Sequence, residues 1–187
     1  DLNSHAGSIL RRNLDGSTPE DNPFVGRSDV LPQVWSYGHR NPQGLVWDNE
    51  NKRLWSIEHG PRGGDEINLI KEGKNYGWPE QECFGDKKFV DPLICYDPAI
   101  EPGGIVFYYG DKLELENFLI MAGVRGSGIF SLDIGDNEIK TKNILSGMGR
   151  IRDVIQGPDG YLYLITSNTD GKAFPDKDDD KLVRILK

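Results

Sequence analysis

Short runs of β-forming residues, separated by Gly, Pro, Asn and Asp, recur along the whole chain of 187 residues, and helical periodicity is nearly absent. This pattern predicts an all-β fold of the sandwich, barrel or propeller type. Twelve such runs, at about four strands per blade, would build about three blades of a propeller. The expected strands cover residues 8–13, 33–37, 44–47, 53–58, 66–70, 104–109, 118–122, 128–133, 139–144, 153–156, 161–166 and 182–186.

Asp-Gly pairs mark tight turns between these runs. They occur in Leu14-Asp15-Gly16, Pro158-Asp159-Gly160 and Thr169-Asp170-Gly171. An Asp side chain bonds to nearby backbone and Gly adopts positive φ without strain, so each pair is expected to form a hairpin connection.

The charge of the chain limits its partners. Lys and Arg number 22 against 30 Asp and Glu, which gives a formal net charge of -8. An acidic surface repels nucleic acid and anionic membranes, so a small uncharged or cationic ligand fits better. No apolar run is long enough to span a bilayer, and no Gly-rich loop joins a strand to a helix as in nucleotide-dependent dehydrogenases.

Three segments carry an unusual density of Gly, Pro, His, Arg and Trp. They read SYGHRNPQGL at 36–45, EHGPRGGDEIN at 58–68 and NYGWP at 75–79. Together they resemble the signature of the soluble quinoprotein sugar dehydrogenases of the glucose/sorbosone dehydrogenase family. The resemblance implies a six-bladed β-propeller that carries pyrroloquinoline quinone (PQQ) and Ca2+. It also implies oxidation of aldose sugars at the anomeric carbon to lactones, with hydride passed to the quinone and on to an external electron acceptor.

Members of that family are nearly twice as long as this chain, and the similarity covers only their second half. Residues 1–187 are therefore expected to form the C-terminal half of a propeller, with the N-terminal blades absent from this chain. An open half propeller leaves sheet edges and inner faces uncovered. The N-terminal half is accordingly an expected partner, beside the aldose and the electron acceptor.

PQQ is a flat quinone with three carboxylates, so its site needs cations and hydrogen-bond donors. Arg40 and Asn41 match the family's cofactor-contacting pair, because an arginine fork suits a carboxylate and an amide suits a quinone oxygen. Taken without the motif, an ion-paired arginine and a turn asparagine before Pro42 would be the better interpretation.

Arg150 and Arg152 alternate with Ile151, so both side chains are expected on one face of a strand. Two like charges on one face need an anion, and the resemblance assigns them to the cofactor carboxylates. The alternative is an exposed face paired with the abundant Asp and Glu. Arg125, in GVRGSG, matches a position where relatives often carry a lysine against the cofactor.

The resemblance places one calcium ion against the cofactor. The backbone carbonyls of Gly60 and Pro61 would bind it, since Ca2+ takes oxygen ligands. His59 stands next to this turn and would bond to the cofactor. Read alone, His59 would be a satisfied polar residue.

A second, structural calcium is implied at Glu66 and the backbone of Tyr76. Without the resemblance, Glu66 reads equally well as one of an exposed acidic pair with Asp65. The acidic run at 176–181 contains lysines and lacks the spacing of an EF-hand, so it is expected to be a solvated loop.

No residue of this chain is expected to be the general base. Sugar oxidation by hydride transfer needs a base that takes the proton of the anomeric hydroxyl. The family uses a histidine of its N-terminal part, and none of His5, His39 and His59 lies in a match to that segment. His39 is expected to be structural, and the chain by itself is expected to be inactive.

Cys83 and Cys95 lie in a segment whose prolines and glycines predict a loop. The residues alone leave a disulfide and two reduced thiols both open. The disulfide is favoured because the resemblance implies an exported protein, periplasmic or secreted.

A second function is compatible with the same fold. A non-catalytic, calcium-binding propeller would recognise other proteins, as in propellers related to hedgehog-interacting proteins. Such a recognition module has no reason to gather arginines at its axis. The set Arg40, Arg125, Arg150 and Arg152 therefore favours the dehydrogenase.

Overall fold

The computed structural model describes residues 2–85, 87–115, 118–134 and 139–186, which form thirteen β-strands and no helix. No helix long and apolar enough to cross a membrane is found in these ranges. The strands are β1 (Ser8–Leu10), β2 (Val34–Tyr37), β3 (Pro42–Asp48), β4 (Arg53–Glu58), β5 (Asp65–Ile70), β6 (Ile94–Tyr96), β7 (Pro102–Tyr108), β8 (Phe118–Gly123), β9 (Gly128–Ile134), β10 (Ile139–Ser146), β11 (Ile151–Gln156), β12 (Leu162–Thr166) and β13 (Leu182–Arg184).

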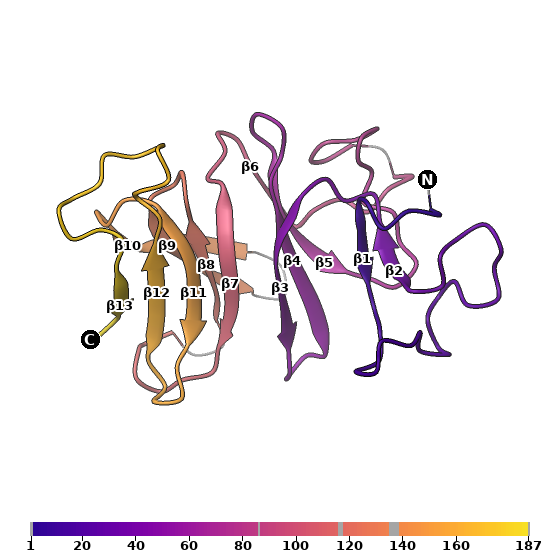
Figure 1. The fold of residues 1–187 in the computed structure, drawn as a ribbon, viewed down its shortest axis with the longest axis horizontal. Helices are drawn as coiled ribbons and strands as arrows, with labels where there is room; N and C mark the ends of the chain where they lie inside the picture. The colour runs from indigo at the N-terminus through magenta and orange to yellow at the C-terminus, as the bar shows by residue number, and fades with distance from the viewer. Residues whose placement is uncertain (1, 86, 116–117, 135–138, 187) are drawn as a thin grey trace.

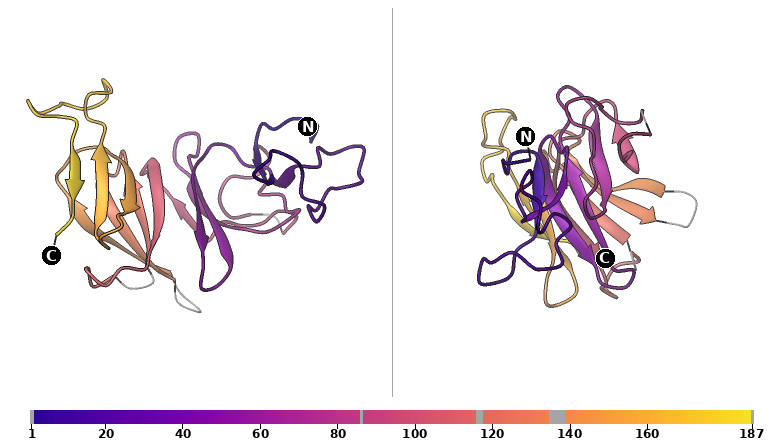
Figure 2. Two further views of the ribbon diagram at one scale, coloured as in Figure 1. Left: turned by 60° about the horizontal axis from the view of Figure 1, so that its bottom comes forward. Right: turned by 90° about the vertical axis from the view of Figure 1, so that its right-hand side faces the viewer.

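The strands form four antiparallel sheets whose neighbours follow one another along the chain. Two are four-stranded, β3-β4-β5-β6 and β7-β8-β9-β10, and β11-β12-β13 and β1-β2 are smaller. The sheets stand in a row, with β1-β2 toward one end and β11-β12-β13 at the other (Figure 1, Figure 2). Successive antiparallel meanders are the blades of a propeller, so the prediction of an all-β, partial propeller is confirmed.

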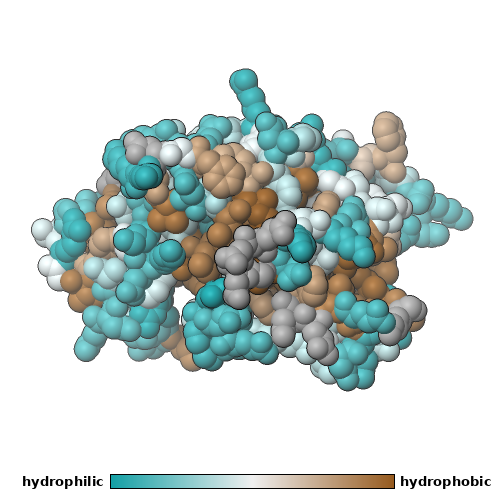
Figure 3. Space-filling model, turned by 180° about the vertical axis from the view of Figure 1, so that it is seen from behind, coloured by the Kyte–Doolittle hydropathy of each residue, from teal (hydrophilic) through white to brown (hydrophobic). Residues whose placement is uncertain are grey.

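The sheet β7-β8-β9-β10 is covered on both faces. On β8, Leu119 and Met121 pack with side chains of β4 and β5, whereas Ile120 and Ala122 pack with side chains of β11 and β12. A strand buried on both sides is apolar at nearly every position, which explains why its sequence FLIMAG shows no alternation. Apolar surface also appears in the middle of the rear face, surrounded by hydrophilic residues (Figure 3).

The first strands of the three larger sheets, β3, β7 and β11, lie side by side, with β7 packed between the other two (Figure 1). Each begins with an irregularity in its pairing, at residues 42–44, 102–105 and 151–153. β-Bulges bend a strand and redirect its side chains, and they are common next to binding sites. Four of the predicted cofactor residues lie at two of these starts, Arg40 and Asn41 before β3 and Arg150 and Arg152 around the first residue of β11.

Two glycines let β7 approach β11 closely at this end. A Cβ atom on Gly103 would overlap the carbonyl oxygen of Arg152, and one on Gly104 would overlap the carboxylate of Asp153. A larger residue at either position would push the strands apart. The spacing of the two sheets at the bulges therefore depends on glycine.

The structure corrects the loop expected around the cysteines. The short strand β6 contains Cys95 and completes its sheet by pairing with β5. Its three residues are too few to show a periodic pattern, so the pairing that creates the strand is invisible in the local sequence. Cys83 and Cys95 form a disulfide, as predicted.

Two of the three expected hairpin turns are also corrected. Residues 159–160 close the tight β11-β12 hairpin, as predicted. Residues 15–16 and 170–171 instead make local turns inside the long connections 11–33 and 167–181. An Asp-Gly pair predicts that the backbone turns at that point. Whether strands flank the turn depends on pairing with segments elsewhere in the chain, which the pair does not indicate.

Candidate functional site

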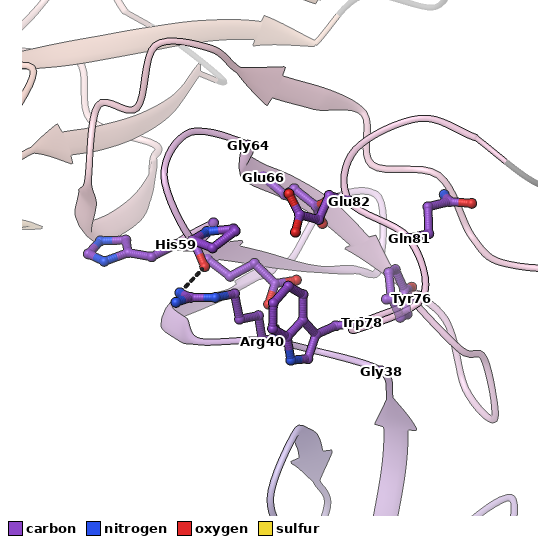
Figure 4. Close-up of a pocket in the computed structure, with 12 residues that line it drawn as sticks. Gly38, Arg40, His59, Gly64, Glu66, Tyr76, Trp78, Gln81 and Glu82 are labelled. Carbon is purple, nitrogen blue, oxygen red and sulfur yellow. Dashed lines mark hydrogen bonds between the residues drawn. The ribbon is translucent and has the colours of Figure 1, made fainter.

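One pocket gathers six of the ten predicted site residues (Figure 4). It lies between the segment that enters β3 and the turn that follows β4. The predicted residues in its lining are Arg40, His59, Gly60, Pro61, Glu66 and Tyr76. The lining is completed by Gly38, Glu58, Gly64, Trp78, Gln81 and Glu82.

A buried carboxylate, that of Glu58, organises the backbone of this pocket. Glu58 ends β4 and is 3% exposed. Its Oε2 accepts hydrogen bonds from the backbone N–H groups of Arg40 at 2.8 Å and Asn41 at 3.3 Å. Its Oε1 accepts from Nδ2 of Asn68 at 2.9 Å and from Nδ1 of His39 at 3.2 Å. Four donors on one carboxylate fix the path of the chain into β3.

His39 is structural, as expected. Its Nε2 lies 2.9 Å from Oγ of Ser36, and its ring stacks on that of Tyr76 with centroids 4.5 Å apart. Ser36 and Glu58 thus contact the two ring nitrogens of His39. A serine, a histidine and a carboxylate in this order are also the residue types of a hydrolase catalytic triad. Ser36 is 0% exposed, however, so no substrate reaches its hydroxyl.

The side chain of Arg40 lies along the pocket (Figure 4). Its Nη1 donates to the carbonyl oxygen of His59 at 3.0 Å, and its guanidinium carbon lies 5.3 Å from the ring centroid of Trp78. Its Nε is buried and has no hydrogen-bond partner within the described ranges. A buried donor without an acceptor is costly, so the pocket favours a ligand that offers one.

His59 connects this pocket to the neighbouring sheet. Its Nε2 lies 2.8 Å from the carbonyl oxygen of Pro102, at the start of β7. A carbonyl oxygen only accepts, so Nε2 carries a hydrogen and the neutral ring keeps Nδ1 as an acceptor.

Asp65 fixes the turn that was predicted to bind calcium. Its Oδ1 accepts from the N–H of Gly60 at 3.0 Å, and its Oδ2 accepts from the N–H groups of Ile100 at 2.8 Å and Glu101 at 2.7 Å. Asp65 is 1% exposed, so the alternative of an exposed acidic pair with Glu66 is wrong. The carboxylate joins the turn after β4 to the start of β7.

Glu66 is a partly buried carboxylate, and burial raises its pKa to about 7. The N–H of Cys83 at 2.9 Å and Nδ2 of Asn68 at 3.1 Å oppose this shift, whereas the negative charges of Glu58 and Glu82 add to it. A carboxylate with acidic neighbours is well placed to attract a cation.

No group of three or more His, Cys, Asp or Glu side chains in the described part of the chain is arranged to hold a metal ion. The predicted calcium ligands Gly60, Pro61 and Tyr76 would act through backbone carbonyls, so clustering of side chains does not bear on them. The acidic run at 176–181 is mostly exposed, as expected for a solvated loop.

Arg150 and Arg152 converge on a carboxylate of the protein itself. Nε of Arg150 lies 3.1 Å from Oδ2 of Asp170, and Nη2 of Arg152 lies 3.7 Å from the same oxygen. Nη2 of Arg150 also lies 3.5 Å from Oε2 of Glu101. The two side chains reach the same oxygen although Arg150 precedes β11 and only Arg152 lies in the strand, so their convergence does not come from regular strand alternation, and acidic side chains pair with them.

Arg125 and Asn41 lie outside the pocket of Arg40. Arg125 is exposed and lines a second groove together with Arg150 and Asn168. Asn41 is also exposed, and its Oδ1 accepts from Nε2 of Gln43 at 2.9 Å.

The predicted cofactor residues therefore form two groups, one at the sheet that begins with β3 and one around the start of β11, and residues at the start of β7 bridge them. Pro102 accepts a hydrogen bond from His59 in the first group, and Glu101 pairs with Arg150 in the second.

Sequence reasoning missed Glu58, Trp78 and Asp170. Glu58 and Trp78 lie inside the recognised segments 58–68 and 75–79, and Asp170 belongs to an Asp-Gly pair. All three residues therefore lie in motifs that the sequence analysis identified, but no role was assigned to them. Their partners come from other strands and loops, which the local sequence does not reveal.

Comparison with known proteins identifies the family of the chain. Residues 1–175 match the family model described as Glucose / Sorbosone dehydrogenase. This chain belongs to the glucose/sorbosone dehydrogenase family.

Several known proteins match almost the whole chain. It is 43% identical over 184 residues to the uncharacterized protein slr1608 of Synechocystis. This alignment covers 90% of this chain and 45% of slr1608. The chain is 36% identical over 189 residues to the aldose sugar dehydrogenase YliI of Escherichia coli, covering 92% and 51% of the two chains. The PQQ-bound form of an aldose sugar dehydrogenase from Streptomyces coelicolor superposes with a TM-score of 0.83 at 38% identity, covering 98% and 53%. The chain thus spans about half the length of the family members it matches.

Proposed function

We propose that this chain forms the C-terminal, cofactor-binding half of an aldose dehydrogenase that depends on PQQ and Ca2+. The complete enzyme would oxidise the anomeric carbon of an aldose to a lactone and pass the electrons to an external acceptor. One observation carries the proposal: Arg40 and the pair Arg150 and Arg152 stand at the starts of β3 and β11, the first strands of the sheets on either side of β7. The PQQ-bound relative from Streptomyces coelicolor supports the choice of cofactor.

The donor groups fit a flat tricarboxylate. Arg150 and Arg152 already hold one carboxylate, that of Asp170, and Arg40 keeps a buried Nε without a partner in the described structure. Arg125 adds an exposed cation beside Arg150. When bound, PQQ supplies the quinone that accepts hydride from the sugar. The arginines would bind its carboxylates and orient it.

Backbone carbonyls would hold the calcium ions. Gly60 and Pro61 would bind the ion next to the cofactor, where it would polarise an oxygen as a Lewis acid. The hydrogen bond from Gly60 to Asp65 fixes this turn. Glu66 and the carbonyl of Tyr76 would bind the structural ion.

Another part of the propeller would supply the general base. His39 is buried against Glu58, and His59 is bound through Nε2 to Pro102. Blades outside this chain would provide the histidine that takes the hydroxyl proton, and they would also cover the sheets at both ends. The disulfide between Cys83 and Cys95 fits an oxidising compartment, so we place the enzyme in the periplasm or outside the cell.

Calorimetric titration of PQQ into the protein in its natural length, with and without Ca2+, tests the proposal. We expect saturable binding that requires Ca2+. Arg150→Met should weaken it by roughly 10- to 100-fold, the value of a hydrogen bond to a charged group. The matched control is Arg53→Met, at the end of β4 away from the pocket that Glu58 lines. This control should change the PQQ affinity less than about twofold. Absence of binding in both conditions would refute the proposal.

A further inference from the structure

The carboxylate of Asp170 occupies the arginine pair that the proposed function assigns to the cofactor. Its Oδ2 lies 3.1 Å from Nε of Arg150 and 3.7 Å from Nη2 of Arg152. Its Oδ1 accepts a hydrogen bond from the N–H of Lys172 at 2.9 Å. The carboxylate is therefore oriented, with one oxygen on its own loop and the other on the arginines.

The formal charges of this cluster are balanced. Arg150 and Arg152 contribute two positive charges, while Asp170 and Glu101 contribute two negative ones. A cofactor carboxylate on the same guanidinium nitrogens would meet the negative charge of Asp170 at short range, although Arg125 and Lys172 add positive charge to the groove. Binding therefore favours the departure of one protein carboxylate.

Of the two carboxylates, that of Asp170 contacts both arginines, whereas Glu101 contacts Arg150 alone at 3.5 Å, so a ligand that takes the arginine pair competes with Asp170. Glu101 adjoins β7, and its backbone N–H is held by the buried Asp65. Asp170 lies in the long connection 167–181, followed by Gly171, around whose Cβ position there is open space. A rotation of the Asp170 side chain toward solvent would displace no core residue.

Resting on the proposed function, we infer that Asp170 is a competing carboxylate that holds Arg150 and Arg152 until a cofactor carboxylate replaces it. The exchange makes and breaks only ion pairs, and one carboxylate takes the place of another. The side chain of Arg152 is 41% exposed, so the entering group can reach the pair from solvent. The side chain of Arg150 is 11% exposed and stays anchored against Glu101.

The test compares PQQ affinity, measured by calorimetry in Ca2+, between the unaltered protein in its natural length and two variants. Asp170→Asn keeps the shape of the side chain and removes its charge. Asp178→Asn removes the same charge from an exposed position in the same connection and serves as the matched control. We expect Asp170→Asn to bind PQQ about tenfold more tightly, which corresponds to about 1.4 kcal/mol, and the control to change less than about twofold.

A gain of affinity distinguishes competition from a structural role, because loss of a structural contact would weaken binding. Unchanged or weaker binding in Asp170→Asn, or a gain equal to that of Asp178→Asn, would overturn the inference and leave the proposed function intact. If the unaltered protein binds no PQQ, the proposed function fails. In that case the same comparison is made with benzene-1,3,5-tricarboxylate, a flat tricarboxylate without a quinone. Tighter binding of this compound by Asp170→Asn than by the unaltered protein supports the inference, and equal binding by the two proteins refutes it.

Discussion

Oε2 of Glu58 accepts a 2.8 Å hydrogen bond from the backbone N–H of Arg40. The last residue of β4 thereby holds the segment that enters β3, and the side chain of Arg40 projects from a backbone that is fixed in place. Glu58 is a positioning residue in this sense, since the same carboxylate also holds the N–H of Asn41.

Glu58→Gln is expected to destabilise the fold by about 1–3 kcal/mol, because an amide has a single acceptor oxygen and its NH2 group would face donors. Urea unfolding should show a lower midpoint. Glu72→Gln, at an exposed site, is the control and should stay within about 0.5 kcal/mol of the unaltered protein. Equal midpoints for the two variants would show that the carboxylate does not organise the pocket.

Gly103→Ala should be more damaging than Gly171→Ala. A Cβ atom at Gly103 would overlap the carbonyl oxygen of Arg152, and relieving such overpacking costs about 1–3 kcal/mol. Gly171 has open space around it, and only its positive φ of 81° resists a side chain, at about 1 kcal/mol. Thermal unfolding of both variants measures the difference. PQQ titration should show weaker binding by Gly103→Ala than by the unaltered protein, and equal affinities of these two proteins would contradict the role of strand spacing.

Reduction of the disulfide is expected to weaken calcium binding. Cys83 donates its N–H to Oε1 of Glu66, and Cys95 pairs with Glu66 across β5 and β6, so the bond ties both neighbours to that carboxylate. Its loss should also lower the stability by about 2–3 kcal/mol. Calcium titration with and without reductant tests this. The double variant Cys83→Ser and Cys95→Ser should show the weaker affinity in both conditions, and an effect of reductant on it would contradict the explanation.

The calcium-free protein should lose stability as the pH rises from about 4.5 to 7. The pKa of Glu66 is raised by burial from 4.5 to about 7 in the folded chain, so the folded state binds more protons than the unfolded state in this window. The contribution is fully present below the lower pKa and is lost above the higher one, by about 3 kcal/mol at most. Unfolding midpoints measured across this range should fall, and the slope should shrink in Glu66→Gln. A slope that persists in that variant would assign the effect to other groups.

Much of the fold could be predicted from the sequence, because turn residues and β-forming runs act locally. The strand Arg53–Glu58 was predicted with its observed bounds. The strand β6 and the two long connections could not be predicted. Each of them depends on the pairing of segments that are far apart in the sequence.

The candidate site divides in the same way. Arg40 and His59 were recognised from two separate motif segments, and the two residues also meet in space. Asp65 and Asp170 act through partners that lie about 20 or more residues away along the chain, namely Glu101 and Arg150. Local residue patterns predict which residues matter, whereas the carboxylates that hold them in place become visible only in three dimensions.

Arg40 and Arg150 stand at the starts of strands in different sheets, on either side of β7. A rigid ligand bound to both arginines would connect the sheet that begins with β3 to the sheet that begins with β11. Such a link is expected to make the sheets unfold together, in a single cooperative step. The width of the thermal transition, and not only its midpoint, would therefore report how much of the protein carries its cofactor.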